Sequence, residues 1–275
     1  MLGIVQGLTE FAPVSSSGHL ILVPWLFNWT FFLENQDLNK TFDVALHVGT
    51  FVGAAGYFWS DIARYVRALF RSIGRRAISS VDERLAWVLA IGTLPGALVG
   101  ALAEDFIEEQ LGQVWLIAMM LGVFGILLYV VDRRASSARS MDDLRLRDGL
   151  LIGVAQAMAL QPGISRSGVT ITAARAAGLD RPSATRFSFL LSLPIIAGAG
   201  VFKGIQVVQE GLPPGTAGPF FWGTLASAVS GFLVIWALLA YLRRRDFAPF
   251  VLYRLALAGV VFAVIVAGVR SASGQ

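Results

Sequence analysis

Six long apolar segments, each of about 20 residues, dominate the sequence and are separated by shorter polar stretches. A helix of about 20 residues spans about 30 Å, which matches the hydrocarbon core of a bilayer. Helices also satisfy their own backbone hydrogen bonds in lipid. The chain is therefore predicted to be an all-α integral membrane protein, in agreement with a composition that is 56% hydrophobic and 15% charged. The segments are Thr41–Trp59, Leu85–Ala103, Val114–Val131, Ser183–Phe202, Phe220–Leu242 and Phe250–Val269.

Arginines gather in three stretches between these segments, at 61–84, 133–148 and 243–245. An acidic group without basic neighbours follows the second apolar segment, and it consists of Glu104, Asp105, Glu108 and Glu109. The positive-inside rule places the arginine-rich stretches in the cytoplasm and the acidic group outside. The same pattern accounts for the net charge of +4, so nucleic acid is not an expected partner.

The chain has no cysteine, which excludes disulfides and thiolate metal sites. We expect no cleavable signal peptide, because the start lacks a basic region and a small-residue cleavage site. We also expect no separate soluble domain. Residues 1–275 are therefore predicted to form a single membrane domain.

Two polar clusters interrupt the apolar sequence, at Val5–Leu20 and Gln161–Gly168. The first lies between Leu2–Ala12 and Gly18–Trp29, apolar segments of about a dozen residues that each cross only about half of a bilayer core. We interpret them as a re-entrant pair, in which two half-helices meet at a non-helical tip within the membrane. The alternative is one kinked span through Leu2–Leu26.

The two clusters are copies of each other at an offset of 150 positions. The matched pairs are Gly3 and Gly153, Gln6 and Gln156, Ser15 and Ser165, Ser17 and Ser167, Gly18 and Gly168, and Ile21 and Ile171. Three full spans separate the copies, so the second re-entrant pair must enter from the opposite face. The prediction is an inverted repeat, about 1–103 and about 149–242, with six transmembrane helices and two re-entrant helix pairs.

Gln6 and Glu10 stand four residues apart, so they share one face of a helix. Such a pair can supply oxygen ligands to a hard cation. The alternative is a hydrogen-bonded pair, which we favour for Gln6 on spacing alone, whereas a carboxylate at the depth of Glu10 needs a partner. Asp43 and His47 could extend the site, although we interpret them as structural.

Ser15, Ser16, Ser17 and Gly18 precede a half-helix, whose N-terminus presents unpaired N–H groups that suit a phosphate. His19 follows Ser16 by three residues, so the two side chains can come close. Serine could then act as the nucleophile with histidine as its base, or histidine could act alone. The alternative is a structural histidine.

The second cluster supplies Arg166 between Ser165 and Ser167. A guanidinium in a wet cavity can bind phosphoryl oxygens and neutralise charge in a transition state. Alternatively, Arg166 only neutralises Glu10, which would still bring the two tips together.

The motifs Q-G-L-T-E-F-A-P-V-S-S-S-G-H and P-G-I-S-R-S-G resemble those of the undecaprenyl-diphosphate phosphatase family, the bacitracin-resistance type of bacterial membrane enzyme. The resemblance covers essentially the whole chain in length, span order and both motifs. It implies removal of the terminal phosphate of undecaprenyl diphosphate, which regenerates the monophosphate carrier for peptidoglycan synthesis. It further implies dependence on Mg²⁺ or Ca²⁺, a homodimer, and a site open to the outer face of the bacterial inner membrane.

The resemblance also implies roles for individual residues. It assigns catalysis to Glu10, Ser16, His19 and Arg166. Ser165 and Ser167 match the family's phosphate-binding residues, and Glu10 and Gln6 match its metal-binding pair. We also predict that Ser15, Ser17 and Gly168 bind the substrate. Because position 6 holds the neutral amide variant of the family motif, Glu10 is the stronger metal ligand. The chain starts almost on this motif, so we expect a trimmed or misassigned start.

A transporter is the rival hypothesis, because inverted repeats with broken helices at mid-membrane are typical of transporters. In this reading the tips bind the head group of a polyprenyl phosphate during flipping, and nothing is hydrolysed. A carrier needs no nucleophile, so the pairing of Ser16 with His19 favours an enzyme.

Overall fold

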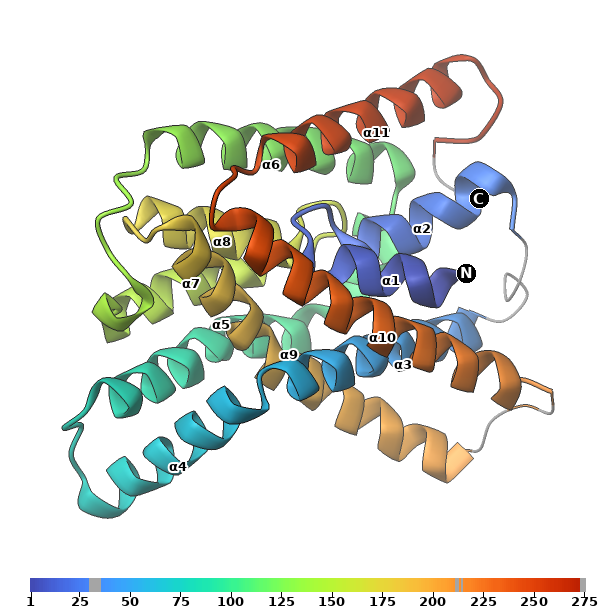
Figure 1. Cartoon of the computed structure of the whole chain (residues 1–275). Helices are drawn as coiled ribbons and strands as arrows, with labels where there is room; N and C mark the ends of the chain where they lie inside the picture. Colours follow the sequence, from blue (N-terminus) through green and yellow to red (C-terminus); the bar gives the residue numbers. More distant parts are fainter. Residues whose placement is uncertain (30–35, 211–212, 214, 273–275) are drawn as a thin grey trace.

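The computed structural model describes residues 1–29, 36–210, 213 and 215–272, and this part of the chain is helical (Figure 1). Its only β-type pairing is an isolated bridge between Arg139 and Leu179. The α-helices are α1 Leu2–Phe11, α2 Ser16–Phe27, α3 Gln36–Tyr57, α4 Trp59–Arg75, α5 Val81–Leu111, α6 Val114–Arg134, α7 Leu146–Met158, α8 Arg166–Ala176, α9 Arg181–Glu210, α10 Ala217–Leu242 and α11 Ala248–Val266. The all-α prediction is confirmed.

Five of these helices, α5, α6, α9, α10 and α11, contain stretches long and apolar enough to cross a membrane. They coincide with five of the six predicted segments. The sixth, Thr41–Trp59, falls mostly within α3, which is not among the five candidates found in the described residues. Its polar residues Asp43 and His47 lower the hydropathy of the helix, and His47 faces the site described below.

Two predicted elements differ in the structure. The stretch 61–84 is not a continuous loop, because Trp59–Arg75 forms α4, a helix with one polar and one apolar face. The backbone of the acidic group at 104–109 continues α5 rather than forming a loop. The arginine-rich stretches lie within or next to the connections α4–α5, α6–α7 and α10–α11, which lie toward the same end of the molecule, on the left of Figure 1.

The predicted half-length helices are present on both sides of each polar cluster. Pro13 follows α1, and α2 begins beyond Ser15, whose hydroxyl accepts a hydrogen bond from Gly18 N at 3.3 Å. Ser165 caps α8 in the same way, with Gly168 N at 3.1 Å. Both serines have a φ of 75°, a left-handed value that is uncommon outside glycine. The two tips therefore share an unusual backbone geometry.

Short helices pack against long ones through glycines at matched positions. α1 crosses α10 at Gly3, where an added Cβ would lie 2.2 Å from Gly223 O. α7 crosses α5 at Gly153, where an added Cβ would lie 2.4 Å from Gly92 O. Small residues allow such close backbone approach, which holds the short helices in place.

Gly153→Ala is expected to destabilise the protein by about 1–3 kcal/mol, because the new methyl group must push two backbones apart. Denaturation of the purified protein with increasing SDS would measure the change. Gly198→Ala is a matched control, since a Cβ at Gly198 would meet nothing within 4 Å. Equal stability of the two variants would contradict the close crossing.

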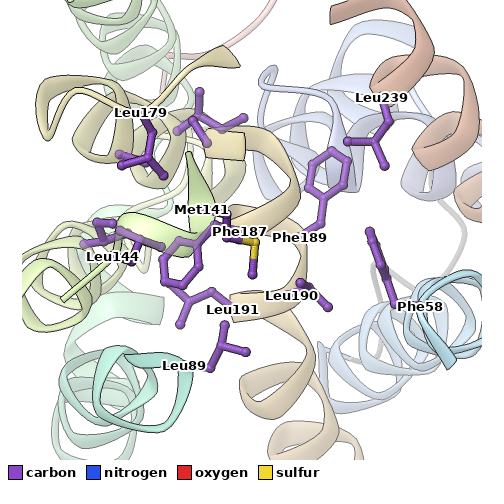
Figure 2. Close-up of a cluster of buried hydrophobic side chains, with 14 of the residues drawn as sticks. Phe58, Leu89, Met141, Leu144, Leu179, Phe187, Phe189, Leu190, Leu191 and Leu239 are labelled. Carbon is purple, nitrogen blue, oxygen red and sulfur yellow. The ribbon is translucent and has the colours of Figure 1, made fainter. Parts of the chain in front are cut away.

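The largest buried apolar cluster of the described residues is built around α9 (Figure 2). Its labelled members in Figure 2 are Phe58, Leu89, Met141, Leu144, Leu179, Phe187, Phe189, Leu190, Leu191 and Leu239. Phe189 makes an edge contact with Phe11 at the end of α1, with ring centroids 5.1 Å apart. Because Phe11 follows Glu10 directly, this packing helps to hold the end of α1, and with it Glu10, in place.

Candidate active site

The carboxylate of Glu10 lies at the centre of the site and is 6% exposed. Its Oε1 accepts a hydrogen bond from Arg166 Nη2 at 2.5 Å. Its Oε2 accepts from Ser16 Oγ at 2.6 Å and from Gln6 Nε2 at 2.8 Å, and His47 Nε2 lies 3.4 Å away. Residues from α1, α2, α3 and α8 therefore converge on one carboxylate, and the two tips meet as predicted.

Further hydrogen bonds join the tips directly. Gly163 N donates to Ser15 Oγ at 3.1 Å, and Ser167 Oγ donates to Ala12 O at 3.0 Å. The hydroxyl groups within each tip are also close, at 3.4 Å for Ser15 and Ser17 and 3.3 Å for the matched pair in the second tip. The predicted substrate-binding serines are thus adjacent in space.

A cavity of about 290 Å³ opens beside the tips. Its polar lining consists of Glu10, Ser15, Ser16, Ser17, His47, Gln156, Ser165 and Arg166. Its apolar lining consists of Val44, Ala159, Leu160, Ile195, Ile196, Ala199 and Gly200. Because α2 begins at Ser16 and α8 begins at Arg166, the N-termini of two helices meet at the polar wall, an arrangement that favours anions.

The predicted approach of His19 to Ser16 is not seen. His19 Nδ1 donates to Ser15 O at 2.7 Å, and its Nε2 lies 2.6 Å from the hydroxyl of Tyr253 on α11. The two rings also stack, with centroids 5.6 Å apart. Both ring nitrogens are therefore engaged away from Ser16, whose hydroxyl instead donates to Glu10.

His47 is the histidine that lines the cavity. Its Nδ1 donates to Asp43 O at 2.8 Å, which turns Nε2 toward Glu10. The sequence analysis interpreted His47 as structural. The signal that could have identified it is a polar pair, Asp43 and His47, one helical turn apart within an otherwise apolar segment.

A double-mutant cycle would test the contact between His19 and Tyr253. His19→Gln and Tyr253→Phe are expected to couple by about 0.5–3 kcal/mol in unfolding free energy, because each change alone leaves the other polar group unpaired. His47→Gln combined with Tyr253→Phe is the control, and those effects should add within about 0.5 kcal/mol. Additivity in both cycles would argue against the contact.

Arg254 on α11 is a buried cation that the sequence analysis missed. It is 0% exposed and has no ion pair with any described residue. Its guanidinium donates to Pro13 O in the first tip at 3.2 Å, and to Gly163 O and Ile164 O in the second tip at 3.0 and 3.1 Å. It also donates to Leu121 O on α6 at 2.9 Å. One side chain thus cross-links both tips and α6.

The donor set around Glu10 has the chemistry of a hard-cation site only in part. Glu10 lines the cavity, and one carboxylate plus substrate phosphate oxygens is a donor set that Mg²⁺ accepts. Gln6 is fully buried outside the cavity lining, and its amide nitrogen donates to Glu10 while its Oε1 has no hydrogen-bond partner. Among the described residues, no three or more His, Cys, Asp or Glu side chains are grouped so that they could hold a metal ion by themselves. Glu10 therefore fits a cation that the substrate helps to hold, and Gln6 orients Glu10.

Comparisons with known proteins show which family and relatives this chain is similar to. A family model described as bacitracin resistance protein BacA matches residues 1–260. A protein of Geobacter sulfurreducens is 46% identical over 97% of this chain and 97% of its own length. Proteins of Pelotomaculum thermopropionicum and Desulforudis audaxviator are 45% and 44% identical, over 97% and 96% of this chain and 95% of their own lengths. Each of the three is named undecaprenyl-diphosphatase.

Proposed function

The chain belongs to the bacitracin resistance protein BacA family, and from this premise we infer that it is an undecaprenyl-diphosphatase of a bacterial membrane. It hydrolyses undecaprenyl diphosphate to undecaprenyl phosphate and inorganic phosphate. The observation that carries this conclusion is the contact of Arg166, Glu10 and Ser16 in the wall of one cavity. A phosphate-binding cation, a base and a hydroxyl nucleophile are the groups that phosphoryl transfer requires.

The cavity suits both ends of such a substrate. Its polar wall, with two helix N-termini and Arg166, would bind the diphosphate. Its apolar wall, formed by residues such as Leu160 and Ile195, would contact the first part of the prenyl chain. The rest of the chain would lie in the surrounding hydrocarbon.

The hydrogen bond from Ser16 to Glu10 supports a role for Ser16 as the nucleophile. Glu10 Oε2 would take the proton of Ser16 as the serine oxygen bonds to the terminal phosphorus. The bridging P–O bond breaks and undecaprenyl phosphate leaves. Water would then hydrolyse the phosphoserine to release inorganic phosphate and restore Ser16. Direct attack by water, with Glu10 as its base, is a variant that uses the same groups.

Arg166 would neutralise the charge that spreads over the transferred phosphoryl oxygens. A bound Mg²⁺ or Ca²⁺, held by Glu10 and the phosphates, would supply additional charge neutralisation. His19 would position the first tip through Ser15 O and Tyr253, and His47 would contact Glu10 or the substrate. The hydrogen bond from Ser16 to a carboxylate also favours hydrolysis over the flippase hypothesis, because a carrier needs no activated hydroxyl.

We further propose that the chain is one membrane domain built as an inverted repeat, about 1–103 and about 149–242, with α3 as the sixth span and two re-entrant pairs. The matched serine caps and glycine crossings support this proposal. So do the matched buried amide oxygens of Gln6 and Gln156, neither of which has a hydrogen-bond partner. The arginine-rich end would face the cytoplasm, with the site open to the outer face of the inner membrane. The homodimer stays a prediction.

Release of phosphate from undecaprenyl diphosphate by the purified protein tests the function directly. Undecaprenyl phosphate serves as the control substrate and should release none. Addition of a chelator should reduce the rate, and excess Mg²⁺ or Ca²⁺ should restore it. No release above a Ser16→Ala control, with either cation present, would refute the proposed activity.

A further inference from the structure

A second cavity, of about 380 Å³, lies at the elbow where α10 and α11 join. Figure 1 shows the two helices diverging from this elbow at the arginine-rich end of the molecule. Three arginines line the cavity, namely Arg181, Arg244 and Arg245. It shares no lining residue with the cavity beside Glu10, so it is a separate feature of the molecule.

The carboxylates around the elbow already pair with arginines, one of which is the cavity-lining Arg181. Asp132 is 4% exposed and accepts hydrogen bonds at 2.9 Å from both Arg175 and Arg181. Asp246, which also lines the cavity, pairs with Arg133 at 3.2 Å. One buried carboxylate therefore serves two guanidinium groups, and a net positive charge remains.

Arg244 and Arg245 add to this excess. Both are exposed, and neither forms an ion pair or a side-chain hydrogen bond with any residue in the described part of the chain. Arg181 is paired with Asp132 and Asp246 with Arg133, so the two remaining lining guanidinium groups leave a positive charge that favours an anion. Guanidinium groups bind phosphate well, because their N–H donors match the spacing of its oxygens.

Apolar side chains also line this cavity. Leu252 on α11 is 67% exposed although it lies within a candidate membrane span, and Tyr241 at the end of α10 is a further lining residue. A free phosphate would gain nothing from these side chains. A lipid would place its phosphate among the arginines and its glycerol and acyl chains along Leu252.

We propose that the elbow between α10 and α11 binds the phosphate group of an anionic glycerophospholipid from the leaflet on the arginine-rich side. This site is independent of the hydrolysis of undecaprenyl diphosphate. Its occupant would connect α10 to α11, the helix that holds both tips through Tyr253 and Arg254.

Binding of short-chain phosphatidylglycerol to the full-length protein in neutral detergent tests the proposal, with phosphatidylcholine of the same chain length as the comparison lipid. The double variant Arg244→Gln, Arg245→Gln is expected to lose affinity for phosphatidylglycerol by roughly 10- to 30-fold. Arg243→Gln is the matched control, since Arg243 is an exposed neighbour outside the cavity lining. It should bind like the unmodified protein, as should Arg166→Gln, which alters only the other cavity.

Three outcomes would overturn the proposal. Unchanged affinity in the double variant would show that the elbow is not the site. An equal loss in Arg243→Gln would show a diffuse effect of surface charge. Displacement of the lipid by inorganic phosphate at similar concentration would show that the cavity takes free phosphate and not a lipid. Because the readout is binding, none of these results depends on phosphatase activity.

Discussion

Replacing Glu10 by glutamine is expected to lower kcat for phosphate release from undecaprenyl diphosphate by about 10²–10⁴-fold, the range in which a general base contributes. The amide has nearly the shape of the carboxylate and still offers an oxygen to Arg166. It cannot take the proton of Ser16, however, and it removes the negative charge that pairs with Arg166. The loss should therefore appear mainly in kcat.

Steady-state kinetics of the purified variant would measure this effect. Thr9→Ala is a matched control on the same helix, because Thr9 is buried and its hydroxyl donates to Val5 O, away from the cavity. Its kcat should stay close to that of the unmodified protein. If the kcat of Glu10→Gln stays within about tenfold of the kcat of the unmodified protein, the loss is smaller than a general base contributes. Glu10 would then not be the base.

Arg254→Lys is expected to lower kcat by about 10²-fold, the cost of misplacing catalytic groups by about 1 Å. Lysine keeps the charge but has a single nitrogen, so it cannot reach carbonyls in both tips and on α6 at once. Arg166 follows the second tip directly, and Glu10 precedes the first. Loss of the cross-link should therefore increase the distance between Arg166 and Glu10.

Measurement of kcat and KM together would identify this as a positioning effect, because lost alignment lowers kcat more than it raises KM. Leu255→Met on the same helix is the control for substitution in α11, since Leu255 is exposed. Arg254→Met should lose at least as much activity as Arg254→Lys. A kcat for Arg254→Met equal to that of the unmodified protein would mean that packing alone aligns the tips.

The long helices were predictable because a helix that spans a bilayer must be about 20 residues long and mostly apolar. The half-length segments around Pro13 and Pro162 are too short to cross, and helices of that length are found on either side of each tip. The sequence analysis did not predict α4, because it used the arginines at 61–84 only to assign this stretch to one side of the membrane. Its apolar residues occupy one face, a pattern that also predicts a surface helix.

The contact of Glu10 with Arg166 was predictable, since a buried carboxylate and a buried guanidinium each need a partner. The orientation of His19 was not, because its partner Tyr253 lies 234 residues away and nothing local indicates it. Arg254 did leave a signal, as the one charged residue inside the apolar segment Phe250–Val269. A charged residue in an apolar segment is expected to have a polar partner. The sequence does not show which groups are the partners of Arg254, and only the structure identifies them as backbone carbonyls.

The ion pair between Arg166 and Glu10 means that the proposed phosphate-binding group already has an anionic partner before substrate arrives. In the proposed mechanism a phosphate oxygen would take the place of the carboxylate at Arg166, so substrate binding would be an exchange of one anion for another. The free energy needed to break the ion pair would then be subtracted from the free energy of substrate binding. The released carboxylate would stay beside Ser16, and the ion pair would form again when inorganic phosphate leaves.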